Sequence, residues 1–417
     1  MKSAPIPTTL FIKNRAKLVD SLTLGSVVLT GSGDRMHRNG DQDYPFRQNS
    51  DFFYLTGINQ EESVLVLAPG HPDTTRQEMI FISKPTPKSR LWSGPGLTRE
   101  EAANRSGIAQ VKWLEDLDGI LELLIPNASN LYAAGTVLIE RISTHYPNLS
   151  HFQLSPLMMR LRMVKEHEEV EEIKKGSVIT RSAFLRVLKM MKPGMWEYEV
   201  EAEITAEFIG SGADGHAYEP IIASGENALI LHYVVNNNRC LDGDLLLMDF
   251  GAEVNNYAAD CSRTIPVNGR FTKRQREVYE AVLRVFRQAK EMMVPGKVMS
   301  EFHNQVGKLW EEEHIRLKLY TRKDAEARSQ EELLWKRYFM HGTSHSLGLD
   351  VHDPFDQTKP FQSGMVLTCE PAIYLPEEGI GIRLENDILI TEDGPVDLME
   401  DIPIEAGEIE ELMQSNR

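Results

Sequence analysis

Cysteine is scarce in this sequence, which has only three in 417 residues, Cys240, Cys261 and Cys369. The number is odd, and no two of them are spaced as Cys-x-x-Cys. This usage argues against a disulfide framework and against a zinc site built on thiolates. We predict that the three thiols are small core residues. A reducing compartment, and so a cytoplasmic location, fits this usage best.

Long apolar runs are also missing. The run at residues 245–248, for example, is far shorter than the roughly 20 residues that a membrane-spanning helix needs. Lys2 is the one early positive charge, and no apolar stretch of signal-peptide length follows it. We therefore expect neither a membrane partner nor a secretory leader.

Positive charge is in deficit, with 45 Lys and Arg against 62 Asp and Glu and a net charge of −17. Such a chain repels phosphate backbones, so nucleic acid is not an expected partner. Carboxylates that gather around cations also count as bare charge in such a tally. The acidic total is therefore compatible with a metal site.

The length favours two domains, because 417 residues exceed what one core usually organises. We predict a smaller N-terminal α/β domain at residues 1–157, with strands at 63–68 and 79–82, and an α+β domain at 158–417. An amphipathic helix is predicted at 162–175, near the start of the second domain. Further helices are predicted at 181–191, 197–210, 273–293, 300–313 and 330–338. Pro193-Gly194 and Pro295-Gly296 each separate two predicted helices, which suggests an internal duplication.

A first predicted hairpin, at residues 245–266, carries two aspartates. If its loop is centred on Val254-Asn255, Asp249 lies directly opposite Asp260, with Cβ atoms roughly 4.5–5.5 Å apart. Like charges in this arrangement are destabilising, and their burial is worse unless a cation lies between them. The alternative is that one aspartate is a surface turn residue and that the facing arrangement is accidental.

A second predicted hairpin, at residues 366–390, repeats this pattern with two glutamates. With its loop centred on Glu377-Glu378, Glu370 faces Glu385 across the strands. Period-2 alternation places Arg383 on the same face as Glu385. The alternative for Arg383 is a plain ion pair with Glu385, which is compatible with a role in a site.

Three histidines, His341, His345 and His352, lie within twelve residues. The spacing of the first two matches HExxH zinc sites, but position 342 is glycine, so the general base of that motif is missing. One imidazole with four carboxylates favours Mn²⁺ or another fairly hard divalent ion. The alternative is that these are surface-loop histidines. His232 follows an apolar run and, taken alone, suits a core or strand-end histidine better than a site.

Four segments together resemble the family of Xaa-Pro aminopeptidases (aminopeptidase P) and prolidases, which have the pita-bread fold. They are LLLMDFGAEVNNYAADCSRTIPVNG, HGTSHSLGLDVHD, TCEPAIYLPEEGIGIRLENDILIT and ILHY. The resemblance covers the chain from about Leu161 onward, and FRQNSDFFYLTG at residues 46–57 extends it into the N-terminal domain. That segment is more similar to aminopeptidase P than to prolidase.

The resemblance implies roles for individual residues. It implies two divalent metal ions, Mn²⁺ first and Co²⁺ or Zn²⁺ as alternatives. The implied metal ligands are Asp249, Asp260, His345, Glu370 and Glu385. The implied catalytic residues are Glu370, as proton shuttle, with His352 and His232. The implied substrate-binding residues are His232, His341, His352, Tyr374 and Arg383.

The resemblance also implies a reaction and partners. We expect a metallo-exopeptidase that hydrolyses the Xaa-Pro bond at the N-terminus of peptides with proline at the second position. A prolidase limited to Xaa-Pro dipeptides is the main alternative, and a non-catalytic pita-bread binding module is a weaker one. A homodimer or homotetramer is expected. Trp92 could wall off the cleft, but a buried tryptophan of the domain core is the preferred interpretation.

Overall fold

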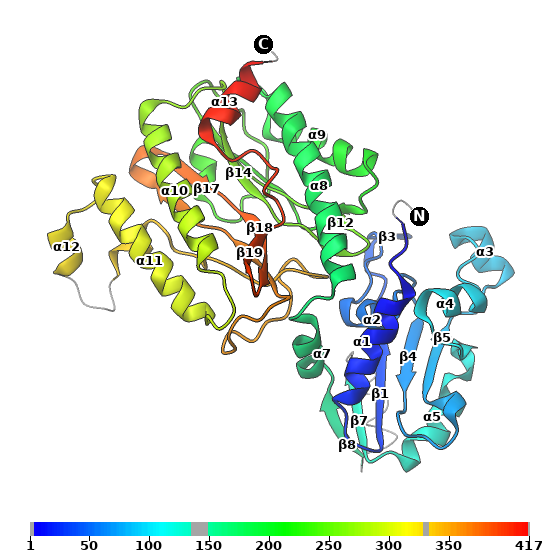
Figure 1. Ribbon diagram of the computed structural model, residues 1–417. Helices are drawn as coiled ribbons and strands as arrows, with labels where there is room; N and C mark the ends of the chain where they lie inside the picture. The colour runs from blue at the N-terminus through cyan, green and yellow to red at the C-terminus, as the bar shows by residue number, and fades with distance from the viewer. Residues whose placement is uncertain (1–3, 135–148, 328–332, 416–417) are drawn as a thin grey trace. The chain divides into compact units, whose positions relative to one another are not determined.

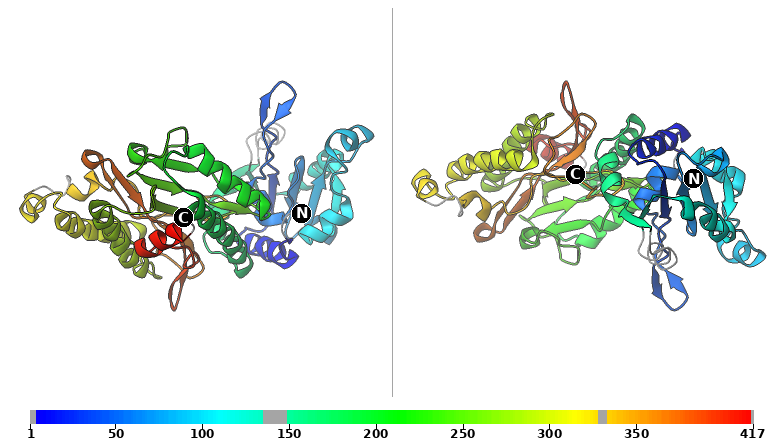
Figure 2. Two further views of the ribbon diagram at one scale, coloured as in Figure 1. Left: turned by 90° about the horizontal axis from the view of Figure 1, so that it is seen from above. Right: turned by 90° about the horizontal axis from the view of Figure 1, so that it is seen from below.

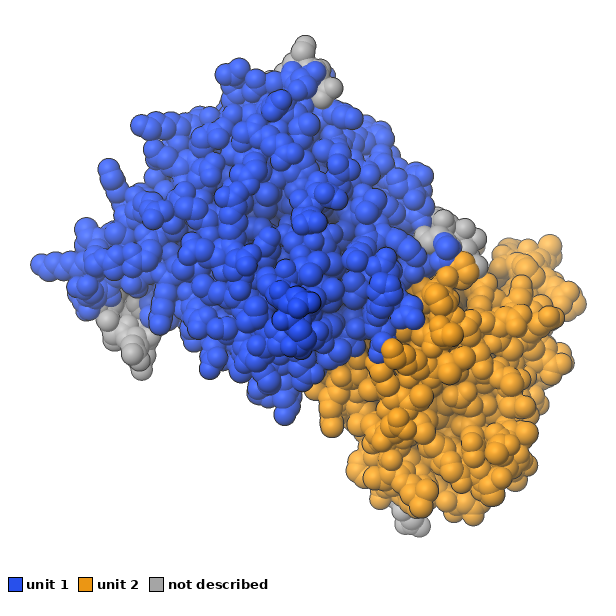
Figure 3. All heavy atoms as spheres, in the orientation of Figure 1, with its two compact units in different colours: residues 1–4, 163–417 blue, residues 5–162 orange. Residues whose placement is uncertain are grey.

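The computed structural model describes residues 4–134, 149–327 and 333–415. The chain divides into two compact units, Pro5–Arg162 and Met163–Arg417, and the second also includes Met1–Ala4 (Figure 3). Each unit mixes helices and strands.

The first unit is built on a sheet in the order β6-β5-β4-β1-β7-β8 (Figure 1). Strands β1, β4 and β5 are antiparallel, whereas β6, β7 and β8 join by parallel pairing. The predicted strands at 63–68 and 79–82 are confirmed as β4 and β5. The strand bounds are β1 (Ser26–Gly31), β4 (Ser63–Leu67), β5 (Glu78–Ile82), β6 (Val111–Trp113), β7 (Asn130–Ala134) and β8 (Ser150–Gln153).

One buried apolar cluster of this unit lies between its sheet and the amphipathic helix α5 (Leu117–Leu124). Val66 and Phe81 of the sheet belong to the same buried cluster as Leu117 and Leu121 of α5. A hairpin, β2 (His37–Asn39) with β3 (Gln42–Asp43), projects away from this sheet (Figure 2). The helices are α1 (Thr8–Asp20), α2 (Ser50–Thr56), α3 (Pro87–Ser93), α4 (Arg99–Ser106), α5 (Leu117–Leu124) and α7 (Ser155–Arg162).

Trp92 is 80% exposed, so the interpretation of a buried core tryptophan is wrong. It lies in α3, a seven-residue helix that contains no buried residue. Its neighbour Leu91 is 81% exposed. The sequence shows an aromatic residue but does not show that this short helix has no core to pack against.

The second unit contains two similar helix pairs. The first pair is α8 (His167–Met190) and α9 (Glu197–Gly210), and the second is α10 (Lys273–Glu291) and α11 (Met299–Arg316). The helices predicted at 162–175 and 181–191 form the single helix α8, which begins only at His167 because Arg162 is the last residue of the preceding helix α7. The helix predicted at 330–338 lies partly outside the described residues, and its described part forms the 3₁₀ turn η5 (Leu334–Arg337).

The backbone joins each helix pair in the same way. Gly194 and Gly296 adopt left-handed conformations with φ of 91° and 87°. The Gly194 N–H donates to the Cys240 carbonyl at 2.8 Å, and the Gly296 N–H donates to the Phe361 carbonyl at 2.9 Å. These matching contacts support the internal duplication that the two Pro-Gly dipeptides suggested.

The strands of the second unit form several small sheets. Helix α8 packs on β12 and β13, and α10 packs on β15, β16 and β17. The three-stranded sheets are β10 (Ile221–Ser224), β11 (Leu245–Asp249) and β14 (Ser262–Pro266); β9 (Gly215–His216), β12 (Ala252–Val254) and β13 (Tyr257–Ala258); and β15 (Val366–Cys369), β18 (Asn386–Thr391) and β19 (Gly394–Asp397). The remaining elements are the pair β16 (Ala372–Leu375) and β17 (Ile380–Arg383), with the helices α12 (Arg322–Glu326) and α13 (Ala406–Gln414).

The three cysteines are free thiols, and each is fully buried in the second unit. This confirms the prediction that they are small core residues. In the described parts of the chain, none of the helices combines the length and the apolar character needed to cross a membrane.

Candidate metal centre

The first hairpin has a register different from the predicted one. Its turn lies at Asn255-Asn256, which adopt left-handed φ values of 50° and 65°, and asparagine tolerates this conformation better than most residues do. Asp249 therefore pairs with Ser262, not with Asp260. The prediction that Asp249 directly faces Asp260 is wrong, because the centre of the loop lies one residue later than predicted.

The two aspartates nevertheless share one face of the hairpin. Asp260 lies two residues before Ser262, and residues two apart on a strand point the same way. The Tyr218 hydroxyl lies between them, 2.6 Å from Asp249 Oδ1 and 2.5 Å from Asp260 Oδ1. Burial, followed by the charges of the two aspartates, raises the pKa of Tyr218 well above its usual value. Tyr218 therefore keeps its proton and can donate it to either carboxylate.

The second hairpin has the predicted register. Ala372 pairs with Arg383 and Cys369 pairs with Asn386, which places Glu370 opposite Glu385. Pro371 has no N–H to donate, and β15 and β16 are separate strands on either side of Glu370-Pro371. The Glu370 N–H donates instead to the Thr343 carbonyl at 2.9 Å, which ties it to the segment with the three histidines.

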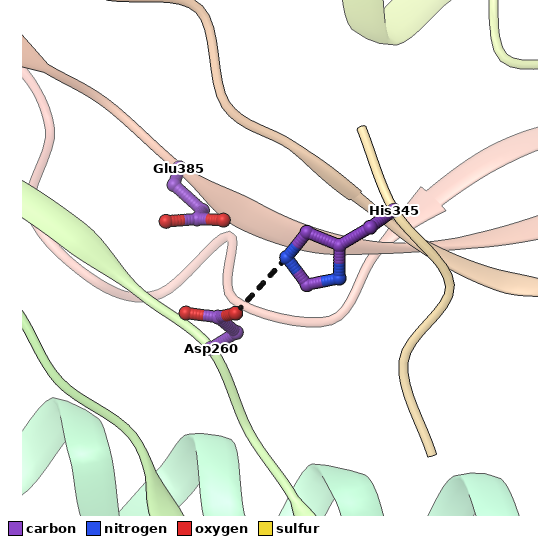
Figure 4. Close-up of side chains that lie close together, drawn as sticks. All are labelled: Asp260, His345 and Glu385. Atoms are coloured by element: carbon purple, nitrogen blue, oxygen red, sulfur yellow. Dashed lines mark ion pairs between the residues drawn. The ribbon is translucent and has the colours of Figure 1, made fainter. Parts of the chain in front are cut away.

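Asp260, His345 and Glu385 form a compact cluster (Figure 4), with one possible ligand atom of each within 4.8 Å of the others. His345 Nε2 lies 3.3 Å from Asp260 Oδ2 and 3.9 Å from Glu370 Oε1. Asp249 is linked to Asp260 through Tyr218. The second unit thus brings together all five predicted metal ligands.

The protein alone does not balance the charges of this cluster. Burial is the largest cause that raises the pKa of Glu370, to about 7. Burial is also the largest cause that raises the pKa values of Asp249 and Glu385. Burial lowers the pKa of His345, but the Asp260 hydrogen bond and the Glu370 charge outweigh it, so the pKa rises to about 9. Burial thus opposes the ionisation of these acids, while His345 beside them holds a proton. Divalent cations would stabilise the ionised acids and take the place of that proton. The residues therefore fit the metal ions that the resemblance implies.

Arg383 joins this cluster to an aromatic hydroxyl. Its Nη2 lies 2.6 Å from Asp249 Oδ2, and its Nη1 donates to the Tyr374 hydroxyl at 2.9 Å. Arg383 therefore forms its ion pair with Asp249. The alternative given from the sequence, an ion pair between Arg383 and Glu385, is wrong. Its Nε donates to Ser262 Oγ at 2.8 Å, and Ser262 Oγ donates to Glu385 Oε2 at 2.6 Å.

Sequence reasoning missed Tyr218 and Ser262. Ser262 could have been found, because it lies two residues after Asp260 and so on the same strand face. Tyr218 gave no such signal, because it follows the short strand β9, far from either hairpin in sequence.

The histidines approach the cluster from two segments. His341 Nε2 lies 3.0 Å from the Tyr374 hydroxyl, and His341 Nδ1 lies 3.5 Å from Glu370 Oε2. The His352 ring contacts the His345 ring, with centroids 4.1 Å apart. The segment from 341 to 353 contains no helix, which agrees with the rejection of a helical HExxH site.

His232 lies on an exposed turn after the 3₁₀ turn η4 (Gly225–Leu229). Burial lowers the pKa values of His341, to about 3, and of His352, and the charge of His232 contributes to both shifts. His232 therefore lies in the electrostatic neighbourhood of the other two histidines.

Comparison with known proteins agrees with this geometry. Residues 171–392 match the model of metallopeptidase family M24, and residues 11–132 match that of the aminopeptidase P N-terminal domain. The Xaa-Pro aminopeptidase of Escherichia coli (strain K12) is 34% identical, over 98% of each chain. Xaa-Pro aminopeptidase 3 of Homo sapiens is 30% identical, over 92% of this chain and 80% of the human one.

Solved structures show the same likeness over both units. Aminopeptidase PepP of Pseudomonas aeruginosa has a TM-score of 0.92 and 30% identity, over 99% of each chain. The Escherichia coli aminopeptidase P with the inhibitor Pro-Leu has a TM-score of 0.89 and 33% identity, over 99% of this chain and 100% of that one. The chain therefore belongs to the Xaa-Pro aminopeptidase family of M24 metallo-exopeptidases, with an N-terminal aminopeptidase P domain and a pita-bread catalytic domain.

Proposed function

We propose that this chain removes the N-terminal residue from peptides whose second residue is proline. The observation that carries this proposal is the cluster of four acids and His345 beside Arg383 and Tyr374, in a unit that matches family M24. The relatives named Xaa-Pro aminopeptidase align over nearly the whole chain. The Escherichia coli neighbour with the inhibitor Pro-Leu supports a peptide substrate.

The same cluster supports a proposal for the cofactor. Asp249, Asp260, His345, Glu370 and Glu385 would hold two divalent ions, and their oxygen-rich set favours Mn²⁺. Co²⁺ and Zn²⁺ are alternatives, and one structural neighbour is a zinc-substituted aminopeptidase P. Bound cations of this kind supply Lewis acidity and an activated water.

The neighbouring side chains would divide the remaining work. Glu370 would carry a proton to the leaving nitrogen of proline, because its carboxylate lies between His345 and His341. His352 and His232 would hold the substrate carbonyl and stabilise the charge that develops on it. His341, Tyr374 and Arg383 would line the pocket for proline. A proline residue within a peptide has no backbone N–H, so the enzyme must recognise its ring with a dedicated pocket.

Location and assembly are proposals as well. Three buried free thiols support a reducing, cytoplasmic environment. The exposed Leu91 and Trp92 support a homodimer or homotetramer, because association would cover large apolar side chains. For Trp92 the remaining interpretation is the alternative one, a wall of the cleft. The domain boundary between residues 157 and 158 remains a prediction.

The test is a steady-state comparison of two substrates with Mn²⁺ added, namely Gly-Pro and a longer peptide that begins Gly-Pro. We expect turnover of the longer peptide, and a matched peptide with alanine in place of proline serves as the control. Turnover of the dipeptide alone would favour prolidase. Turnover of neither substrate would favour the non-catalytic binding module.

A further inference from the structure

A fully buried carboxylate in the second unit has no part in the metal cluster. Glu197 is the first residue of α9 and is 0% exposed. Its Oε1 accepts hydrogen bonds from Ser224 N at 2.7 Å, Ser224 Oγ at 2.8 Å and Asn227 Nδ2 at 2.9 Å. Its Oε2 accepts from the Tyr233 hydroxyl and from Asn238 N, both at 2.8 Å. Five donors saturate a group that has about four lone-pair directions.

All five donors come from one stretch of chain, residues 224–238, and this stretch contains His232. The backbone repeats the connection, because the Glu197 N–H donates to the Asn238 carbonyl at 2.9 Å. Ser224 and Asn238 are the first and last residues of the stretch, and Tyr233 follows His232 directly in the sequence. One carboxylate therefore fixes the stretch at both ends and beside its histidine.

Part of this stretch also packs on the strands of the site. Turn η4 contacts β16 and β17, which carry Tyr374 and Arg383. A Cβ atom at Gly381 would lie 2.3 Å from the Ala228 carbonyl oxygen, so only glycine allows this approach. His232 thus extends from a segment held on one side by Glu197 and on the other by β17.

The internal duplication shows that the fold alone does not require this carboxylate. Glu197 and Met299 occupy equivalent places, since each is the first residue of its helix and lies three residues after a left-handed glycine, Gly194 or Gly296. Met299 is also buried, at 8% exposure. The same helix start therefore forms with an apolar side chain in the second repeat.

We propose that Glu197 is a positioning residue that holds the segment 224–238 so that His232 is presented to the substrate. This proposal rests on the proposed function, because His232 has a purpose only if a substrate binds there. Glu197 is fully buried, and the hydrogen bonds of its carboxylate go to this segment and not to the five metal ligands. Its effect on the reaction should therefore pass through the segment, and chiefly through His232.

The first test replaces Glu197 with glutamine and follows backbone hydrogen exchange of residues 224–238 in the metal-loaded full-length enzyme. The amide keeps the shape, but its nitrogen cannot accept, so at least one backbone N–H of the segment loses its acceptor. Glu201→Gln is the matched control, because Glu201 lies one turn later and accepts from Asn236 Nδ2 alone at 2.9 Å, a bond that an amide oxygen can keep. We expect about tenfold faster exchange in Glu197→Gln and none of this effect in Glu201→Gln. Equal exchange in both variants would overturn the anchoring role.

The second test is a double-mutant cycle with His232→Ala, read as kcat/KM on a longer Xaa-Pro peptide. We expect Glu197→Gln to lose roughly tenfold to 100-fold with full metal content, and the double variant to be no slower than His232→Ala alone. Losses that multiply would show that Glu197 acts independently of His232 and would overturn the proposal. If Glu197→Gln does not fold, Tyr233→Phe removes one of the five donors and enters the same cycle.

The two tests separate this proposal from the proposed function. If the wild-type enzyme cleaves no Xaa-Pro peptide, the proposed function fails, and the catalytic purpose of the anchor fails with it. Hydrogen exchange would still decide whether Glu197 holds the segment. If the wild-type enzyme is active and the cycle is additive, only the positioning role fails.

Discussion

Replacing Lys165 with methionine should destabilise the catalytic unit by about 3–5 kcal/mol, the usual result of removing one partner from a buried ion pair. Lys165 Nζ lies 3.2 Å from Asp353 Oδ2, and each side chain is 1% exposed. At this separation the attraction is roughly 5 kcal/mol for an effective dielectric constant of 20. The methionine variant would leave the Asp353 carboxylate buried without its cation.

The same pair should matter for metal binding. Lys165 Nζ also lies 3.4 Å from Ser346 Oγ, and the Asp353 N–H donates to the Ser346 carbonyl at 2.9 Å. These contacts close the loop whose ends carry His345 and His352. Loss of the lysine should therefore weaken Mn²⁺ affinity as well as stability.

Urea unfolding with and without Mn²⁺ measures both effects. The double variant Lys165→Met/Asp353→Leu is the matched control, because removing both charges should restore most of the lost stability. A single variant within about 1 kcal/mol of the wild type would refute the reasoning, since the loss expected for a broken buried pair is several times larger. A double variant as unstable as the single one would also refute it.

Three further predictions concern single side chains. Glu385→Ala should strip bound metal and abolish hydrolysis, and a fully active variant with two bound ions by elemental analysis would contradict the ligand assignment. His352→Ala should lower kcat by roughly 100-fold or more while metal content stays unchanged, and an unchanged kcat would remove it from the mechanism. His314 is fully buried, and burial lowers its pKa from 6.5 to about 3, so the stability present above pH 6.5 is lost as the pH falls toward 3. As the pH falls from 7 to 4, the free energy of unfolding of His314→Phe should therefore rise by about 3 kcal/mol relative to that of the wild type. Parallel pH dependences of the two proteins in urea unfolding would contradict this.

The sequence predicted the second hairpin better than the first for a local reason. The turn at Pro376–Glu378 is followed by Gly379 in the left-handed region, so residue types alone located its centre. In the first hairpin the turn uses Asn255 and Asn256, which both tolerate left-handed φ, whereas the predicted centre included the β-branched Val254. The turn chemistry of the two asparagines would have located the centre one residue later. Because residues of one face stay together in either register, Asp249 and Asp260 still share a side.

Other features of the site depend on contacts between distant parts of the chain. The pairing of Arg383 with Asp249 joins two hairpins, and no spacing within either one predicts it. Tyr218 reaches the aspartates from outside both hairpins. The roles assigned to the histidines and acids remain predictions, and the residue that anchors His232 became visible only once the fold was known.

The separate core of the first unit affects how any of these stability effects can be measured. A six-stranded sheet and a buried apolar cluster of its own give residues 5–162 what a domain needs to melt as a cooperative unit. Calorimetry of the whole chain can then show two transitions, and a single Tm would average over both. Only the transition that moves to higher temperature on addition of Mn²⁺ would report on the unit that carries the five ligands.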